Sequence, residues 1–179
     1  MKTLRSIVIF IFFLILVSCR PTIYSRIVDI KNEYNSANPE KQIVIINKEF
    51  APLKEIMTKL KSELTENNVI IFAWVNHMPK IGTNDYYCLI YNYDNNKKYY
   101  IKNSEAKIHD LIISNSSLNF EAEDYILDKY IDKGQFFFDS LTPFTSSEFG
   151  TRYELIDTKE NQGFSIQGFT LKDKGNVSD

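Results

Sequence analysis

Arginine, histidine, cysteine and glycine are all scarce in this chain of 179 residues. After residue 5 the arginines are Arg20, Arg26 and Arg152 alone, so there are few of the forked side chains that clamp phosphate groups. Two histidines are too few for a multi-histidine metal centre, and the six glycines form no phosphate-binding loop. We therefore expect no cofactor.

One long apolar run is present, from Ile7 to Val17. It follows the cationic residues Lys2 and Arg5 and ends in the short stretch Leu16-Val17-Ser18-Cys19. A cationic head, an apolar stretch of about 7–15 residues and a small-residue ending together predict an export signal. The run is too short to span a bilayer, which takes roughly 20 apolar residues.

The stretch Leu16-Val17-Ser18-Cys19 resembles the lipobox of bacterial lipoproteins. This resemblance implies that a diacylglyceryl group is attached to Cys19, that residues 1–18 are removed, and that the new amino terminus is acylated. It implies a bacterial cell-envelope protein held to the membrane by the lipid on Cys19. In some Gram-negative bacteria an acidic cluster after the lipidated cysteine resembles a surface-export tag, and aspartate at the next position resembles an inner-membrane retention signal. No acidic cluster follows Cys19 and residue 20 is arginine, so the resemblance implies the outer membrane, facing the periplasm.

The charge balance argues against nucleic acid as a partner. Without Lys2 and Arg5 the 21 basic residues fall to 19, and the 23 acidic residues are unchanged, which gives the mature chain a net charge of 19 − 23 = −4. Nucleic-acid binding requires a clustered basic surface. We expect no nucleic-acid partner.

The mature chain has the length of a single domain. We predict a flexible tether over 19–40, which begins with the lipidated Cys19, one domain over 41–171 and a disordered tail over 172–179. The polar residues of the tether disfavour regular structure, although 23–28 could form a short edge strand. The predicted fold class is α+β: an antiparallel or mixed β-sheet packed by one long amphipathic helix and a second, shorter helix.

Two helices are predicted from apolar spacing and end signals. The long one covers 49–66, where apolar residues recur at three- and four-residue steps and Pro52 suits the first turn. The shorter one covers 120–133, with Asn119 as its cap and Gly134 at its end.

Strands are predicted from β-branched and aromatic runs between turn residues. The run at 69–75 is apolar throughout, which is typical of a central strand, and with 42–47 and the long helix it could form a parallel crossover. Residues 104–114 fit a helix or a strand, and 136–138 fit a strand or deep core. The remaining predicted strands form two hairpins, 86–93 with 97–102 and 152–157 with 164–171.

Cys88 is the one cysteine left once Cys19 carries lipid, so no disulfide can form within the chain. It lies in an apolar run, which predicts a buried thiol. A nucleophilic role would need a nearby base and a lowered pKa.

Catalysis has few candidates: His77, His109 and Asp110. The pair His109-Asp110 resembles one found in metal phosphohydrolases, but those enzymes need further ligands. A zinc site could combine both histidines with a carboxylate, yet no paired spacing supports it, so we predict no metal site.

Carboxylates recur on one face of the second predicted helix, at Asp124, Asp128 and Asp132. They could form a divalent-cation face or a glycosidase acid and base. The simpler interpretation is a solvated acidic face, because an exposed stripe has no burial to shift its pKa values.

The first hairpin is rich in tyrosine. Tyr87, Tyr91 and Tyr93 share one face of a strand, since side chains alternate, and Tyr99 lies on the partner strand. An open aromatic face could stack on sugars or on a partner protein. These four residues are the predicted binding residues.

The sequence therefore predicts a non-enzymatic lipoprotein that binds a protein or glycan partner near the membrane. One alternative is a small envelope hydrolase that uses His77 and His109 with a carboxylate. Another is an immunity-type inhibitor of an envelope-acting toxin.

Overall fold

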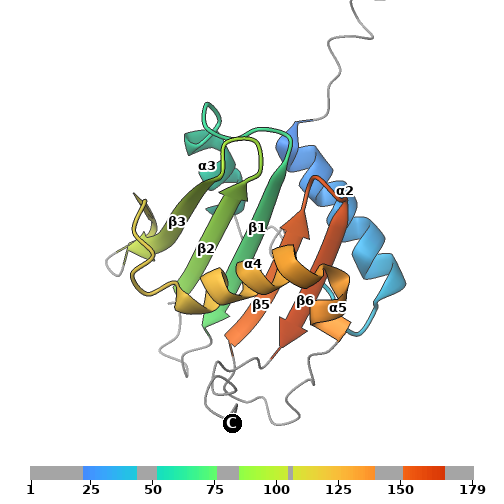
Figure 1. The fold of residues 1–179 in the computed structure, drawn as a ribbon. Coiled ribbons are helices and arrows are strands. Elements are labelled where there is room, and N and C mark those ends of the chain that lie inside the picture. Colours follow the sequence, from blue (N-terminus) through green and yellow to red (C-terminus); the bar gives the residue numbers. More distant parts are fainter. Residues whose placement is uncertain (1–21, 44–51, 76–84, 105–106, 140–150, 168–179) are drawn as a thin grey trace, which may run out of the picture.

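The computed structural model describes residues 22–43, 52–75, 85–104, 107–139 and 151–167, drawn in colour in Figure 1. Cys19, His77, residues 44–47 of the first predicted strand, residues 168–171 of the last and the predicted tail lie outside these ranges. Within them, no helix combines the length and apolarity needed to cross a membrane.

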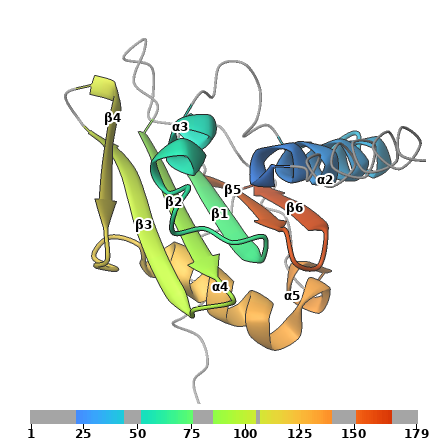
Figure 2. The same ribbon diagram turned by 90° about the horizontal axis from the view of Figure 1, so that it is seen from above.

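Six strands form one antiparallel sheet in the order β4-β3-β2-β1-β5-β6. Helices cover both of its faces (Figures 1 and 2). The predicted α+β class is confirmed, and the ambiguous 104–114 stretch is a strand. The strands are β1 (Asn68–Val75), β2 (Asp85–Asn92), β3 (Lys97–Ser104), β4 (Lys107–Ser114), β5 (Thr151–Asp157) and β6 (Gln162–Gln167).

Strand β1 is central, as its continuous apolarity predicted. Val69 and Ile71 face one layer of helices while Ile70 and Phe72 face the other, and all four side chains are fully buried. Both neighbours of β1, β2 and β5, run antiparallel to it. The possible parallel crossover over 42–76 is therefore wrong, because both edges of β1 are already paired antiparallel.

Asparagines make both hairpin turns. Asn96 and Asn161 have φ of 56° and 54°, a left-handed conformation that asparagine adopts more readily than most residues. In the first turn the Asn95 side chain also accepts a hydrogen bond from the Lys97 backbone N–H. The antiparallel pairings of β2 with β3 and of β5 with β6 confirm both predicted hairpins. Strand β6 begins at Gln162, before the predicted 164, and 168–171 lie outside the described residues.

Helices α4 (Glu121–Lys133) and α5 (Gln135–Asp139) cover one face of the sheet (Figure 1). The predicted helix over 120–133 is confirmed, but Asn119 has φ of 73° and Phe120 takes the cap position without a side-chain hydrogen bond. Residues 136–138 belong to α5 and not to a strand: Phe137 is buried and Phe136 is exposed.

Helices α2 (Ile23–Ala37) and α3 (Pro52–Lys59) lie on the opposite face (Figure 2). Helix α3 is shorter than the predicted 49–66, because turns replace the helix after Lys59. Leu60 and Leu64 are nevertheless buried in the same core as Leu53 and Ile56. The apolar spacing in 49–66 thus predicted the buried residues correctly, but the prediction of a helix up to residue 66 was wrong.

Helix α2 corrects the predicted tether over 19–40 and the possible strand over 23–28. Thr22 caps the helix by accepting a hydrogen bond from the Ser25 N–H, and Ile27 and Ile30 are buried against the sheet. The Asn35 side chain pairs with both backbone groups of Ile43, at 2.7 and 3.0 Å. Residues 23–37 therefore belong to the domain, because buried packing outweighs their weak helix propensity.

Candidate binding surface at the β4 edge of the sheet

Strand β4 is an edge strand that carries exposed apolar side chains. Its register places Ile112 opposite Lys102 and Ile113 opposite Ile101, so the two isoleucines lie on opposite faces of the sheet. They are 46% and 38% exposed, and Leu118, just after the strand, is 72% exposed. We call these three residues the β4 surface. An edge with unpaired backbone groups and apolar side chains is a template for pairing with another chain.

An open hollow of about 490 Å³ adjoins the β4 surface where the chain enters α4. Three carboxylates, those of Glu121, Asp124 and Asp128, contribute to its lining. We call it the acidic hollow; its remaining lining residues are Ser116, Ser117, Leu118 and Tyr125.

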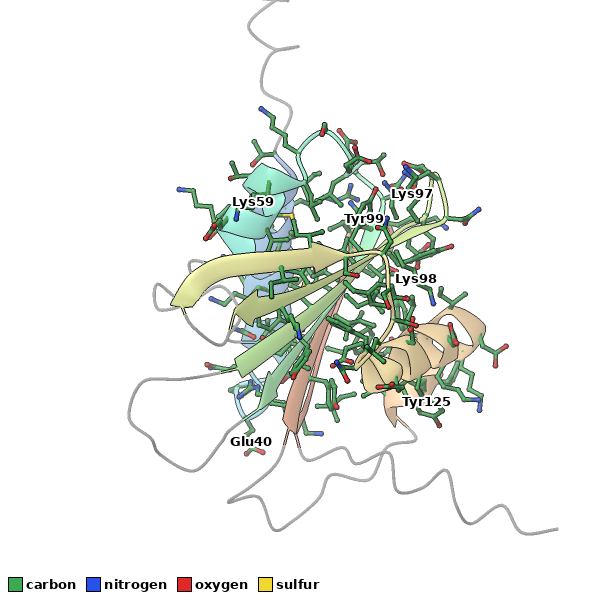
Figure 3. The ribbon with its side chains drawn as sticks, turned by 90° about the vertical axis from the view of Figure 1, so that its left-hand side faces the viewer. Glu40, Lys59, Lys97, Lys98, Tyr99 and Tyr125 are labelled. Atoms are coloured by element: carbon green, nitrogen blue, oxygen red, sulfur yellow. The ribbon has the colours of Figure 1, made fainter. Side chains whose placement is uncertain are left out.

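Lys98 partly neutralises the acidic hollow. Its ammonium lies 2.7 Å from Asp124 Oδ1 and 3.7 Å from Asp128 Oδ1. Figure 3 shows Lys98 on the side of α4 and Tyr99 on the other side of β3. Three carboxylates against one ammonium leave the hollow with a net negative charge.

The three aspartates predicted on one face of the second helix, Asp124, Asp128 and Asp132, differ in their exposure. Asp128 and Asp132 are exposed, as a solvated face requires, whereas Asp124 is half-buried and accepts hydrogen bonds from Lys98 and Tyr100. Burial, followed by the hydrogen bond to Asp124, raises the pKa of Tyr100 above its ordinary value. Tyr100 thus stays protonated as a donor, and Asp124 joins α4 to the sheet.

The predicted tyrosines do not form one open face. Tyr87, Tyr91 and Tyr93 lie half-buried on the α4 side, whereas Tyr99 is buried in the core on the α2 and α3 side. Because Tyr99 pairs with Ile90, it shares that residue's face, so grouping Tyr99 with the other three was wrong.

The three tyrosines on the α4 side are engaged within the domain. The Tyr87 ring contacts Phe120 edge-on, and Tyr91 O–H donates to Asn96 Oδ1 at 2.8 Å. Tyr93 O–H donates to Asp157 Oδ2 at 2.9 Å. These contacts tie loops and strands together, which leaves little open aromatic area for stacking on a sugar.

The catalytic candidates remain unsupported by any described cluster. His109 and Asp110 lie on β4, and His77 lies outside the described residues. Within the described ranges, no three His, Cys, Asp or Glu side chains are placed to hold a metal ion.

Cys88 is fully buried in the core between the sheet and helices α2 and α3, as predicted. Burial raises the pKa of its thiol, so the nucleophilic thiolate is disfavoured. Cys88 acts as a small apolar side chain.

Sequence reasoning missed the β4 surface because 104–114 fitted both a helix and a strand. The available signal was Leu111-Ile112-Ile113, followed at once by the polar stretch 114–117. In a central strand consecutive isoleucines are buried on both faces. In an edge strand they are left partly exposed on both.

Comparison of the chain with protein-family models, curated proteins and solved structures found no match.

Proposed function

We propose that this chain is a non-enzymatic, lipid-anchored binding protein of the bacterial envelope that holds a partner protein at its β4 surface. The observation that carries the proposal is the exposure of Ile112 and Ile113 on opposite faces of one edge strand. A strand added by a partner would pair with the outer backbone edge of β4, which none of the described strands occupies, and cover apolar side chains on both faces.

A protein partner fits this surface better than a glycan. Sugars are bound by aromatic rings that lie open, whereas Tyr87, Tyr91 and Tyr93 are half-buried and contact other groups of the domain. Aliphatic side chains beside unpaired backbone N–H and C=O groups suit an extended peptide segment. The adjacent acidic hollow favours a segment with lysine or arginine near its apolar residues.

Metabolic labelling tests the anchor. Cells expressing the full chain are given radioactive palmitate, and the wild type is compared with Cys19→Ala. We expect label and membrane association in the wild type and neither in the variant. Equal labelling of both proteins would overturn the lipid anchor.

Affinity capture from detergent-solubilised membranes tests the binding surface. The tagged full chain is compared with Ile112→Lys/Ile113→Lys and with Ile131→Lys, a matched control on α4 whose isoleucine is 50% exposed. We expect one protein to be retained by the wild type and by Ile131→Lys, and to be lost with the double variant. Equal recovery from all three would place the binding site elsewhere. A circular dichroism melt of each variant would show that the fold is kept.

A further inference from the structure

The short distance between Cys19 and the folded domain restricts how the domain lies on a membrane. Only Arg20, Pro21 and Thr22 separate Cys19 from Ile23, the first residue of α2. Four backbone steps of about 3.8 Å span at most about 15 Å, whatever their conformation. A lipid on Cys19 would therefore hold the start of α2 close to the headgroups.

The start of α2 lies at the same end of the sheet as three connections between elements (Figure 1). We call this end the turn face, and it comprises Arg26, 61–67, 93–97 and 158–161. The first turn of α2 is bonded directly to it, because Arg26 Nε donates to Asn161 Oδ1 at 3.0 Å.

Hydrogen bonds join the connections of the turn face into one unit. Asn67 Nδ2 donates to Asp94 Oδ1 at 3.0 Å, and Tyr93 N–H donates to the Asn67 carbonyl at 3.0 Å. Thr158 N–H donates to the Asn68 carbonyl, and Thr158 Oγ1 donates to the Glu66 carbonyl at 2.8 Å. These bonds hold the face together as one surface next to the start of α2.

The charges of the turn face suit an anionic bilayer better than those of the acidic hollow. The mature chain has a net charge of 19 − 23 = −4, yet this face carries four basic and four acidic residues and is neutral. An anionic leaflet repels nearby negative charge within a Debye length of about 8 Å. The charged residues are Arg26, Lys61, Lys97 and Lys159, with Glu63, Glu66, Asp94 and Glu160.

The geometry points to the turn face as the surface that rests on the phospholipid headgroups. This inference rests on the proposed anchor at Cys19 and adds an orientation to it. The exposed large apolar side chains of the described residues all lie outside this face, so it contacts headgroups without inserting into the acyl region. The short link keeps the start of α2 close to the membrane, and the Arg26–Asn161 bond joins the start of α2 to the rest of the turn face. This arrangement replaces the flexible tether predicted for 19–40.

Lipid quenching at matched positions tests the orientation. Ser62 lies on the turn face and Ser117 lies before α4, and both are exposed. Each is changed to cysteine in the full chain, labelled with a fluorophore and reconstituted into vesicles that contain headgroup spin-labelled lipid. Cys88 is buried, so it should stay unlabelled.

We expect quenching at Ser62→Cys to exceed that at Ser117→Cys by at least about threefold. Equal quenching, or stronger quenching at Ser117→Cys, in protein that floats with the vesicles would overturn the orientation and leave the anchor intact. Protein that fails to float would overturn the anchor, and the orientation with it.

A longer link between Cys19 and α2 tests whether the short link sets the orientation of the domain. Twelve Gly/Ser residues inserted between Pro21 and Thr22 should let the domain leave the surface, because a flexible chain of this length spans on the order of 20 Å. We expect quenching at Ser62→Cys to fall to the level of Ser117→Cys while flotation is kept. Unchanged quenching would show that the short link does not set the orientation.

Discussion

The ammonium of Lys98 lies 2.7 Å from Asp124 Oδ1, and Tyr100 O–H reaches both oxygens of the same carboxylate at 3.1 Å. Both donors come from β3, and the acceptor comes from the first turn of α4. One carboxylate, which also lines the acidic hollow, thus joins the helix to the sheet.

Removing Asp124 should cost more than removing Lys98. Asp124→Ala leaves the buried Tyr100 and the half-buried Lys98 without their acceptor, so we expect a loss of about 2 kcal/mol in the free energy of unfolding. Lys98→Met keeps the Tyr100 hydrogen bond and should cost about 1 kcal/mol. Urea unfolding of both variants and of the double variant measures the coupling. Strictly additive losses would show that the ion pair contributes nothing.

Asp157 should be among the polar residues most sensitive to substitution. Its buried carboxylate accepts hydrogen bonds from Tyr93 and Tyr130 at 2.9 and 2.8 Å, and from the backbone N–H groups of Lys159 and Glu160. We expect Asp157→Ala to cost about 3 kcal/mol or more, because four donors lose their acceptor. Tyr130→Phe removes one of these four donors and should cost about 1 kcal/mol. Similar losses for both variants in thermal or urea unfolding would contradict this.

Glu123 should make stability depend on pH. Its side chain is buried on α4, and loss of solvation, reinforced by Asp124 and Glu121, raises the pKa from 4.5 to about 7. Between these values the folded state binds more protons than the unfolded state, so the free energy of unfolding falls as pH rises. At about 1.4 kcal/mol per unit, the Glu123 contribution should fall by about 3 kcal/mol between pH 4 and pH 8.

The comparison of wild type with Glu123→Gln isolates this effect from other carboxylates. The variant should be less dependent on pH and more stable than the wild type at pH 8. Asp132→Asn changes an exposed carboxylate near the other end of the same helix and should keep the wild-type slope. Parallel stability curves for wild type and Glu123→Gln would contradict the assignment.

Helix α2 should behave as part of the core. Ile27 is fully buried, so Ile27→Ala should cost about 2–4 kcal/mol, whereas the exposed Glu33→Ala on the same helix should change stability by less than about 0.5 kcal/mol. Urea unfolding checks both variants. A negligible cost for Ile27→Ala would restore the tether predicted for 19–40.

The sheet was the more predictable part of the fold. The apolar run at 69–75 and the Asx-rich turn at 94–96 are local signals, and the central strand and first hairpin formed where those signals lie. The same holds for α4, whose acidic first turn and terminal Gly134 mark its ends.

Helix α2 was missed because contacts such as Arg26–Asn161 are distant in sequence. Ile23, Ile27, Ile30 and Tyr34 have helical spacing, but the asparagines among them suggested a linker. Asn35 proves structural because it bonds to Ile43.

The grouping of Tyr99 with the other three predicted binding tyrosines was wrong for a related reason. Strand alternation placed Tyr87, Tyr91 and Tyr93 correctly, but the face of Tyr99 depends on its pairing with Ile90. A shift of one residue in that pairing would exchange Tyr99 and Tyr100. Likewise, the run Leu111-Ile112-Ile113 indicates an apolar strand, but its exposure depends on its place at the edge of the sheet, which no local pattern in 104–114 specifies.

Site-specific photocrosslinking in living cells tests most directly whether β4 holds a partner. A photoreactive amino acid is placed at Ile113 of the full chain, and at Ile131 as the matched exposed control. We expect one crosslinked envelope protein from position 113, absent from position 131 and lost when Ile112→Lys is added. No adduct at 113, or the same adduct at both positions, would contradict partner binding at the β4 surface.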